Sequence, residues 1–170
     1  MMTIEEAIKT ALEYETRIRD IYSDAAERVS DPVAKRTLQM LRDDEQYHID
    51  YLRSRLELWQ KTGKLSADKL ESTIPPGETI RKETEKIEDV MPKDDRNAEI
   101  EILSKALKAE VETSNFYRKM VDEMTDESQQ MFARFLEIED NHIAAVQAEL
   151  DYITKTGYWF DFKEFDMEEM

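Results

Sequence analysis

Apolar residues recur along this chain at alternating steps of four and three, which is the period of one face of an α-helix. The first stripe follows Thr3 and Glu6, a pair typical of the capping box that begins a helix. Its positions are Ile4, Ile8, Ala11, Glu15, Ile18, Tyr22, Ala25 and Val29. The pattern predicts a long helix whose inner face packs against a core.

A second stripe follows closely, and Asp31 and Pro32 are typical of the N-cap and first residue of its helix. Its positions are Ala34, Leu38, Leu41, Glu45, His48, Leu52, Leu56 and Trp59. The stripe ends near Gly63. Because only a short turn separates the two helices, we predict an antiparallel helix hairpin over residues 3–60.

The next segment, residues 61–96, lacks this period and contains Pro75, Pro76, Gly77 and Pro92 as helix stops. Only short helices are expected in it, over residues 66–70 and 79–88. A connection of this length can run the full height of a helix bundle. We therefore interpret it as a crossover rather than a domain boundary, which allows the flanking long helices to lie parallel.

Two further stripes predict a second hairpin over residues 97–156, with a turn near Thr125 and an end at Gly157. The third stripe has the positions Ile100, Leu103, Leu107, Glu110, Ser114, Tyr117, Val121 and Met124. The fourth has the positions Phe132, Phe135, Glu139, His142, Val146, Leu150 and Ile153. The tail over residues 157–170 is rich in aromatic residues, and we expect it to fold back over the bundle or over a dimer mate.

Taken together, these patterns predict one all-α domain over residues 1–170, a four-helix bundle with one long crossover between its second and third long helices and an aromatic C-terminal tail. The low content of glycine and proline, 3 and 4 residues, agrees with long helices. The two hairpins also repeat each other. The motifs Glu15…Tyr22 and Glu45-x-x-His48 match Glu110…Tyr117 and Glu139-x-x-His142.

Each apolar stripe is interrupted near its middle by ionisable residues, all at one level of the predicted bundle. They are Glu15, Glu45, His48, Glu110, Glu139 and His142. Burying unpaired carboxylates is costly, so a positive charge is expected among them. Two divalent ions would balance four carboxylates, and residues three apart on a helix can reach one ion. We expect the glutamates without a nearby histidine to bridge the two ions.

Composition narrows the chemistry of such a site. The chain has no cysteine, which excludes disulfides, thiolate zinc sites and iron–sulfur clusters. Carboxylates with one imidazole per ion suit iron, and secondly manganese, with zinc as a substitute in purified protein. A net charge of −16 disfavours nucleic acid and membrane as partners. No leader pattern or long apolar run is present, so a cytoplasmic location is expected.

The order of these motifs around the long crossover resembles the rubrerythrin branch of the ferritin-like di-iron carboxylate proteins, over nearly the whole chain. The resemblance implies that the four glutamates and two histidines are metal ligands. It implies that Tyr22 and Tyr117 contact the ligands, although packing in the core is the alternative for both. Asp44, directly before Glu45, resembles the aspartate that orients a ligand histidine in such proteins.

Three departures from that family bear on function. Rubrerythrins carry a four-cysteine rubredoxin module, so this chain would need electrons from a separate donor such as a rubredoxin. Thr113 stands where rubrerythrins place a further glutamate, which implies a more symmetric site. Ile138 stands where a second aspartate would precede Glu139, so one histidine has no predicted orienting group.

The resemblance implies a di-iron oxidoreductase, expected as a homodimer, that reduces hydrogen peroxide or oxygen. One alternative is a ferroxidase of the ferritin type, which oxidises ferrous iron for storage and needs a hollow cage. A second alternative is a non-enzymatic bundle that binds metal or a partner. The structural alternative to a metal site is a hydrogen-bonded Glu/His network.

Overall fold

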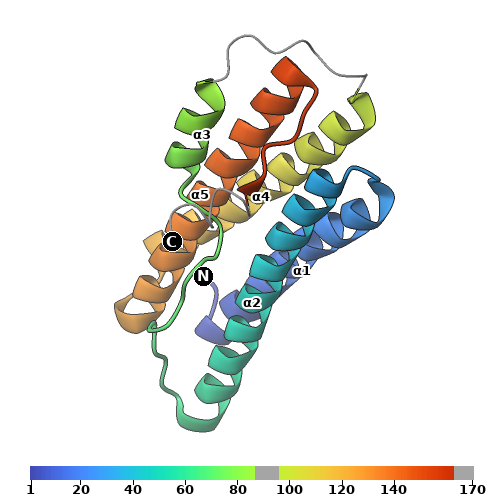
Figure 1. Cartoon of the computed structure of the whole chain (residues 1–170). Helices are drawn as coiled ribbons and strands as arrows, with labels where there is room; N and C mark the ends of the chain where they lie inside the picture. The colour runs from blue at the N-terminus through green and yellow to red at the C-terminus, as the bar shows by residue number, and fades with distance from the viewer. Residues whose placement is uncertain (87–95, 163–170) are drawn as a thin grey trace.

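The computed structural model describes residues 1–86 and 96–162, and over this part of the chain every regular element is a helix. The elements are α1 (Ile4–Arg28), α2 (Pro32–Thr62), α3 (Gly77–Glu85), α4 (Asn97–Glu123) and α5 (Asp126–Thr156) (Figure 1). The prediction of an all-α chain is confirmed for these residues.

The helices begin and end at residues that satisfy their free backbone groups. Thr3 and Glu6 form the expected capping box, each side chain accepting a hydrogen bond from the other residue's backbone N–H. The Asp31 carboxylate caps α2. Gly63 and Gly157 end α2 and α5 in the left-handed conformation, with φ of 67° and 73°. A residue with a Cβ atom would be strained there.

The long helices pack as two hairpins that lie against each other. Short turns join α1 to α2 and α4 to α5, and α1 packs on α4 between the hairpins (Figure 1). Residues 63–76 follow α2 and lead to α3, which packs on α5. The result is a helical bundle with a long connection along one side.

The crossover differs from its prediction. No helix forms over residues 66–70, because the carbonyl groups of Ser66, Asp68 and Lys69 accept hydrogen bonds from tyrosines on α2, and Lys69 has a φ of 65°. A helix does form later, but it spans Gly77–Glu85 instead of residues 79–88. Residues 87 and 88 of the predicted helix lie outside the described residues.

The core consists of two apolar clusters with a polar layer between them. One cluster includes Ile18, Leu38 and the C-terminal half of α5, and the other includes Ile8 and Phe132 near the opposite end of the bundle. Both clusters draw side chains from α1, α2, α4 and α5. The helix turns between them carry the ionisable residues described below.

The described part of the tail, residues 157–162, folds back over the first cluster. Trp159 and Phe162 are buried there, the Trp159 indole N–H donates to Glu99 at 3.1 Å, and Arg36 pairs with Asp161 at 2.8 Å. Residues 163–170, which include the last aromatic residue of the tail, lie outside the described residues. None of the described helices has the length and apolar character needed to cross a membrane.

Candidate metal centre

Six ionisable side chains meet in the polar layer, and each of them is fully buried. They are Glu15 from α1, Glu45 and His48 from α2, Glu110 from α4, and Glu139 and His142 from α5. The helical period places each of them on the inner face of its helix, between the two apolar clusters. The structure therefore brings together all six residues that the sequence singled out.

Their ligand atoms form two overlapping groups, in each of which all atoms lie within 4.8 Å of one another. Glu15 and His48 belong to one group, and Glu110 and His142 belong to the other. Glu45 and Glu139 belong to both. The residues common to both groups are those of the Glu-x-x-His motifs, whereas the glutamates without a nearby histidine were expected from the sequence to be shared between two ions.

The two tyrosines hold the unshared glutamates. The Tyr22 hydroxyl donates to Glu110 Oε1 at 2.9 Å, and the Tyr117 hydroxyl donates to Glu15 Oε1 at 2.7 Å. Each tyrosine thus contacts the glutamate of the opposite hairpin, not the one on its own helix. This leaves Oε2 of both glutamates buried and without a hydrogen-bond partner.

Eight buried atoms of the layer have no hydrogen-bond partner. They are Glu15 Oε2, Glu110 Oε2, both carboxylate oxygens of Glu45 and of Glu139, His48 Nδ1 and His142 Nδ1. His142 Nδ1 lies 2.9 Å from Glu45 Oε1, but without the geometry of a hydrogen bond. The eight atoms divide into two sets of three oxygens and one nitrogen. Unpartnered buried groups are costly, and two cations would satisfy all of them.

The other ring nitrogen of each histidine is hydrogen-bonded on the outer side of the layer. His48 Nε2 lies 3.1 Å from the carbonyl oxygen of Glu71, and His142 Nε2 lies 2.7 Å from Asp44 Oδ2. A carbonyl oxygen only accepts, so His48 carries its proton on Nε2. The lone pair of Nδ1 then points toward the centre, as a metal ligand requires.

Asp44 is itself held by two residues of the crossover. Ser72 donates its hydroxyl to Asp44 Oδ2 at 2.7 Å, and Thr73 donates its backbone N–H to Asp44 Oδ1 at 2.8 Å. The role suggested for Asp44 by the family resemblance matches this geometry, although the histidine it contacts lies on α5. The contacts of residues 71–73 were not foreseen, because the crossover has no period that could place them.

Two of the three departures from the rubrerythrin pattern lie in the described core. Ile138 is buried in an apolar cluster, and the acceptor next to His48 Nε2 is the Glu71 carbonyl. Thr113 is buried, and its hydroxyl donates to the carbonyl of Ala109 one turn earlier on α4. Thr113 therefore adds no ligand atom to the layer.

The negative charges of the four buried glutamates shift the pKa values of the layer. Burial, followed by the negative charges of neighbouring glutamates, raises the pKa of both Glu15 and Glu139 well above the ordinary value. Burial acts to lower the pKa of His142, but the charges of Glu110 and Glu45 outweigh it and the pKa is raised. Without cations the layer therefore retains protons, and bound cations would replace them.

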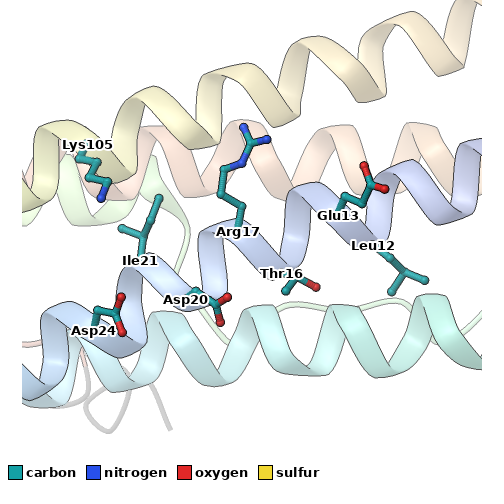
Figure 2. Close-up of a pocket in the computed structure, with 8 residues that line it drawn as sticks. All are labelled: Leu12, Glu13, Thr16, Arg17, Asp20, Ile21, Asp24 and Lys105. Carbon is teal, nitrogen blue, oxygen red and sulfur yellow. The ribbon is translucent and has the colours of Figure 1, made fainter.

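A separate groove lies on the surface between α1 and α4, with a volume of about 670 Å³. Figure 2 shows its lining side chains, among them Glu13, Arg17, Asp20 and Lys105. These residues are charged and solvent-facing, and no member of the buried Glu/His layer lines the groove. The enclosed layer, and not this groove, is the candidate functional site.

Comparisons with known proteins support the fold but do not indicate a function. No protein-family model and no curated protein matches the chain. A solved structure of a hypothetical protein from Pyrococcus furiosus is similar to it, with 21% identity, a TM-score of 0.63, and coverage of 92% of this chain and 94% of that chain. At this level of identity the likeness shows a shared helical fold alone.

Proposed function

We propose that this chain is a ferritin-like di-metal protein of the rubrerythrin type, which binds two iron ions and reduces hydrogen peroxide or oxygen. The observation that carries the proposal is the set of eight unpartnered ligand atoms at one buried level. They divide into two groups that share Glu45 and Glu139. In the alternative, a protonated Glu/His network without metal, Glu15 would pair with Glu45 and Glu139 with Glu110, and metal titration distinguishes the two.

The donor set favours iron or manganese over other metals. Each group offers three carboxylate oxygens and one imidazole nitrogen, and no cysteine is available in the chain. Oxygen-rich sites of this kind suit iron and manganese, whereas structural zinc sites use more nitrogen or sulfur. Zinc binds such ligands strongly and would replace iron in protein purified in air.

Bound ferrous iron would supply the two electrons that, with two protons, convert hydrogen peroxide to two molecules of water. The protein's own residues set the conditions for this. Glu15 and Glu110 are each held by a tyrosine through one oxygen, and the other oxygen of each has no hydrogen-bond partner. The two apolar clusters exclude bulk water from both sides of the layer. A separate donor protein would restore the electrons.

Anaerobic titration with ferrous iron tests the metal site. We expect about two ions per chain, as in di-iron carboxylate bundles. Glu15→Gln should lower both stoichiometry and affinity, since it removes the charge of a carboxylate that belongs to one ligand group. Glu13→Gln is the matched control, because Glu13 is exposed on the same helix two residues away. Equal binding by the two variants, or no binding by the natural chain, would refute the site.

Rapid mixing of the iron-loaded protein with peroxide or with oxygen tests the reaction. A peroxide reductase should be oxidised faster by hydrogen peroxide than by oxygen, and a chemical or protein reductant should restore it through repeated turnovers. Faster oxidation by oxygen, together with a hollow cage detected by light scattering, would favour ferritin-type storage instead.

A further inference from the structure

The two halves of the candidate metal centre repeat in sequence, but the acceptors that hydrogen-bond to Nε2 of their histidines differ. His142 Nε2 lies 2.7 Å from a carboxylate oxygen of Asp44, and His48 Nε2 lies 3.1 Å from the backbone carbonyl of Glu71. Asp44 Oδ2 is 3.8 Å from His48 Nε2, which is beyond hydrogen-bonding distance. One histidine therefore faces a charged acceptor and the other a neutral one.

This difference has a local cause in each hairpin. Asp44 precedes Glu45 on α2, whereas Ile138 precedes Glu139 on α5 and packs in an apolar cluster. Ser72 Oγ and the Thr73 backbone N–H hold Asp44 in place. The carboxylate is therefore fixed on the His142 side by the crossover, and the described residues place no equivalent carboxylate on the His48 side.

The ligand arrangement is the same in the two halves. In each half one tyrosine hydroxyl holds the unshared glutamate, and each group offers three glutamate oxygens and one Nδ1 atom. Glu45 and Glu139 contribute to both groups. The two groups differ instead around the outer ring nitrogens: the acceptor at His142 is charged and Ser72 Oγ lies 3.4 Å from its Nε2, whereas the acceptor at His48 is neutral and the rings of Tyr47 and Phe135 pack against that histidine.

A carboxylate that accepts the outer N–H of an imidazole increases the electron density on the other ring nitrogen and fixes the ring. A neutral carbonyl fixes the ring but adds less to its basicity. We infer that the two ion positions are inequivalent, and that the one formed by Glu45, Glu110, Glu139 and His142 binds its ion first and more tightly. This rests on the proposed di-metal function and adds an order of loading to it.

The chain contains only two histidines, which makes the order of loading measurable in the natural protein. With ¹⁵N-labelled histidine, NMR should show two imidazole spin systems, assigned by His48→Gln and His142→Gln. Addition of Zn²⁺ below one equivalent should shift the His142 signals first. Simultaneous shifts of both imidazoles, or a first shift at His48, would overturn the inference. Absence of any Zn²⁺ binding would instead refute the proposed metal site.

Affinities of single-position variants give a second measurement. His48→Ala retains the His142 position and His142→Ala retains the His48 position, and competition with a chromophoric chelator measures Zn²⁺ affinity in each. We expect the first variant to bind about 10–100-fold more tightly, the usual effect of such outer carboxylates. Equal affinities, with circular dichroism showing both variants folded, would overturn the inference.

Asp44→Asn completes the test, because it removes the negative charge behind His142. Added to His48→Ala, it should weaken Zn²⁺ binding to the level of His142→Ala. Added to His142→Ala, it should have a smaller effect, since Asp44 Oδ2 lies 3.8 Å from His48 Nε2 and makes no hydrogen bond to it. An equal loss in both backgrounds would show a general electrostatic effect and contradict the assignment to one position.

Discussion

The hydroxyl of Tyr22 donates a hydrogen bond of 2.9 Å to Oε1 of Glu110, a residue on the other helix hairpin. Tyr117 makes the reciprocal contact with Glu15 at 2.7 Å. The two hydrogen bonds cross between α1 and α4 at the level of the Glu/His layer. They fix the unshared glutamates and join the two hairpins at the place where the core is polar.

Removing one of these hydroxyl groups should destabilise the fold. We expect Tyr22→Phe to lower the free energy of unfolding by about 1.5–3 kcal/mol, the range for a hydrogen bond to a charged group. Tyr14→Phe is the control, because the described contacts of Tyr14 are made by its ring, which stacks on Phe116 and lies under Arg17, and the variant keeps the ring. Urea denaturation of the metal-free proteins measures both, and equal effects would contradict the role given to the Tyr22 hydroxyl.

Metal ions should stabilise the protein strongly, because they bind the folded chain alone. At a free ion concentration 100 times the dissociation constant, one site adds about 2.7 kcal/mol to the free energy of unfolding. Glu139→Gln should lose most of this gain, since Glu139 belongs to both ligand groups. Glu137→Gln, exposed on the same helix, should keep it. Denaturation of each protein with Mn²⁺ and with a chelator measures how much the metal raises its free energy of unfolding.

Glu149 should make stability depend on pH. It is buried beneath the tail, where its carboxylate accepts the Phe160 backbone N–H at 2.6 Å. Burial raises its pKa well above the ordinary value of 4.5, although the Phe160 hydrogen bond acts in the opposite direction. The unfolded chain therefore loses this proton first, and the contribution of Glu149 to the free energy of unfolding falls as the pH rises above about 4.5.

The variant Glu149→Gln removes this titration. We expect it to raise the free energy of unfolding at pH 8 by about 1–3 kcal/mol and to leave it nearly unchanged at pH 4. Asp151→Asn, exposed on the same helix, should show no such dependence. Denaturation curves of the variant and the natural protein at pH 4 and pH 8 measure this effect. An effect of the same size at both pH values would contradict the titration assigned to Glu149.

Gly77 should be required for the crossover to dock on α5. A Cβ atom at this position would lie 2.9 Å from both Asn141 O and Ala145 N, which are backbone atoms and cannot move aside easily. We expect Gly77→Ala to cost about 1–3 kcal/mol and to increase hydrogen exchange in α3. Gly63→Ala has free space and only backbone strain, so it should leave α3 exchange unchanged.

Much of the fold and of the candidate site follows from local pattern. The helical period predicts four long helices, and their observed bounds differ from the prediction by only a few residues at most ends. The same period places Glu45 and His48 on one inner face, at the level of Glu139 and His142. These results depend on side chains three and four residues apart, which the helix itself brings together.

Other features depend on residues far apart in the sequence, and only the tertiary structure decides them. Tyr22 contacts Glu110 and not Glu15, the carbonyl of Glu71 hydrogen-bonds to His48, and Asp44 hydrogen-bonds to His142 on the other hairpin. The crossover has no apolar period, so its hydrogen bonds are set by the side chains of α2 and α5 beside it. The sequence by itself thus determined which residues face the core, because that depends on local helix geometry. The tertiary structure determined how they are paired, because hydrogen bonds between helices depend on how the hairpins pack.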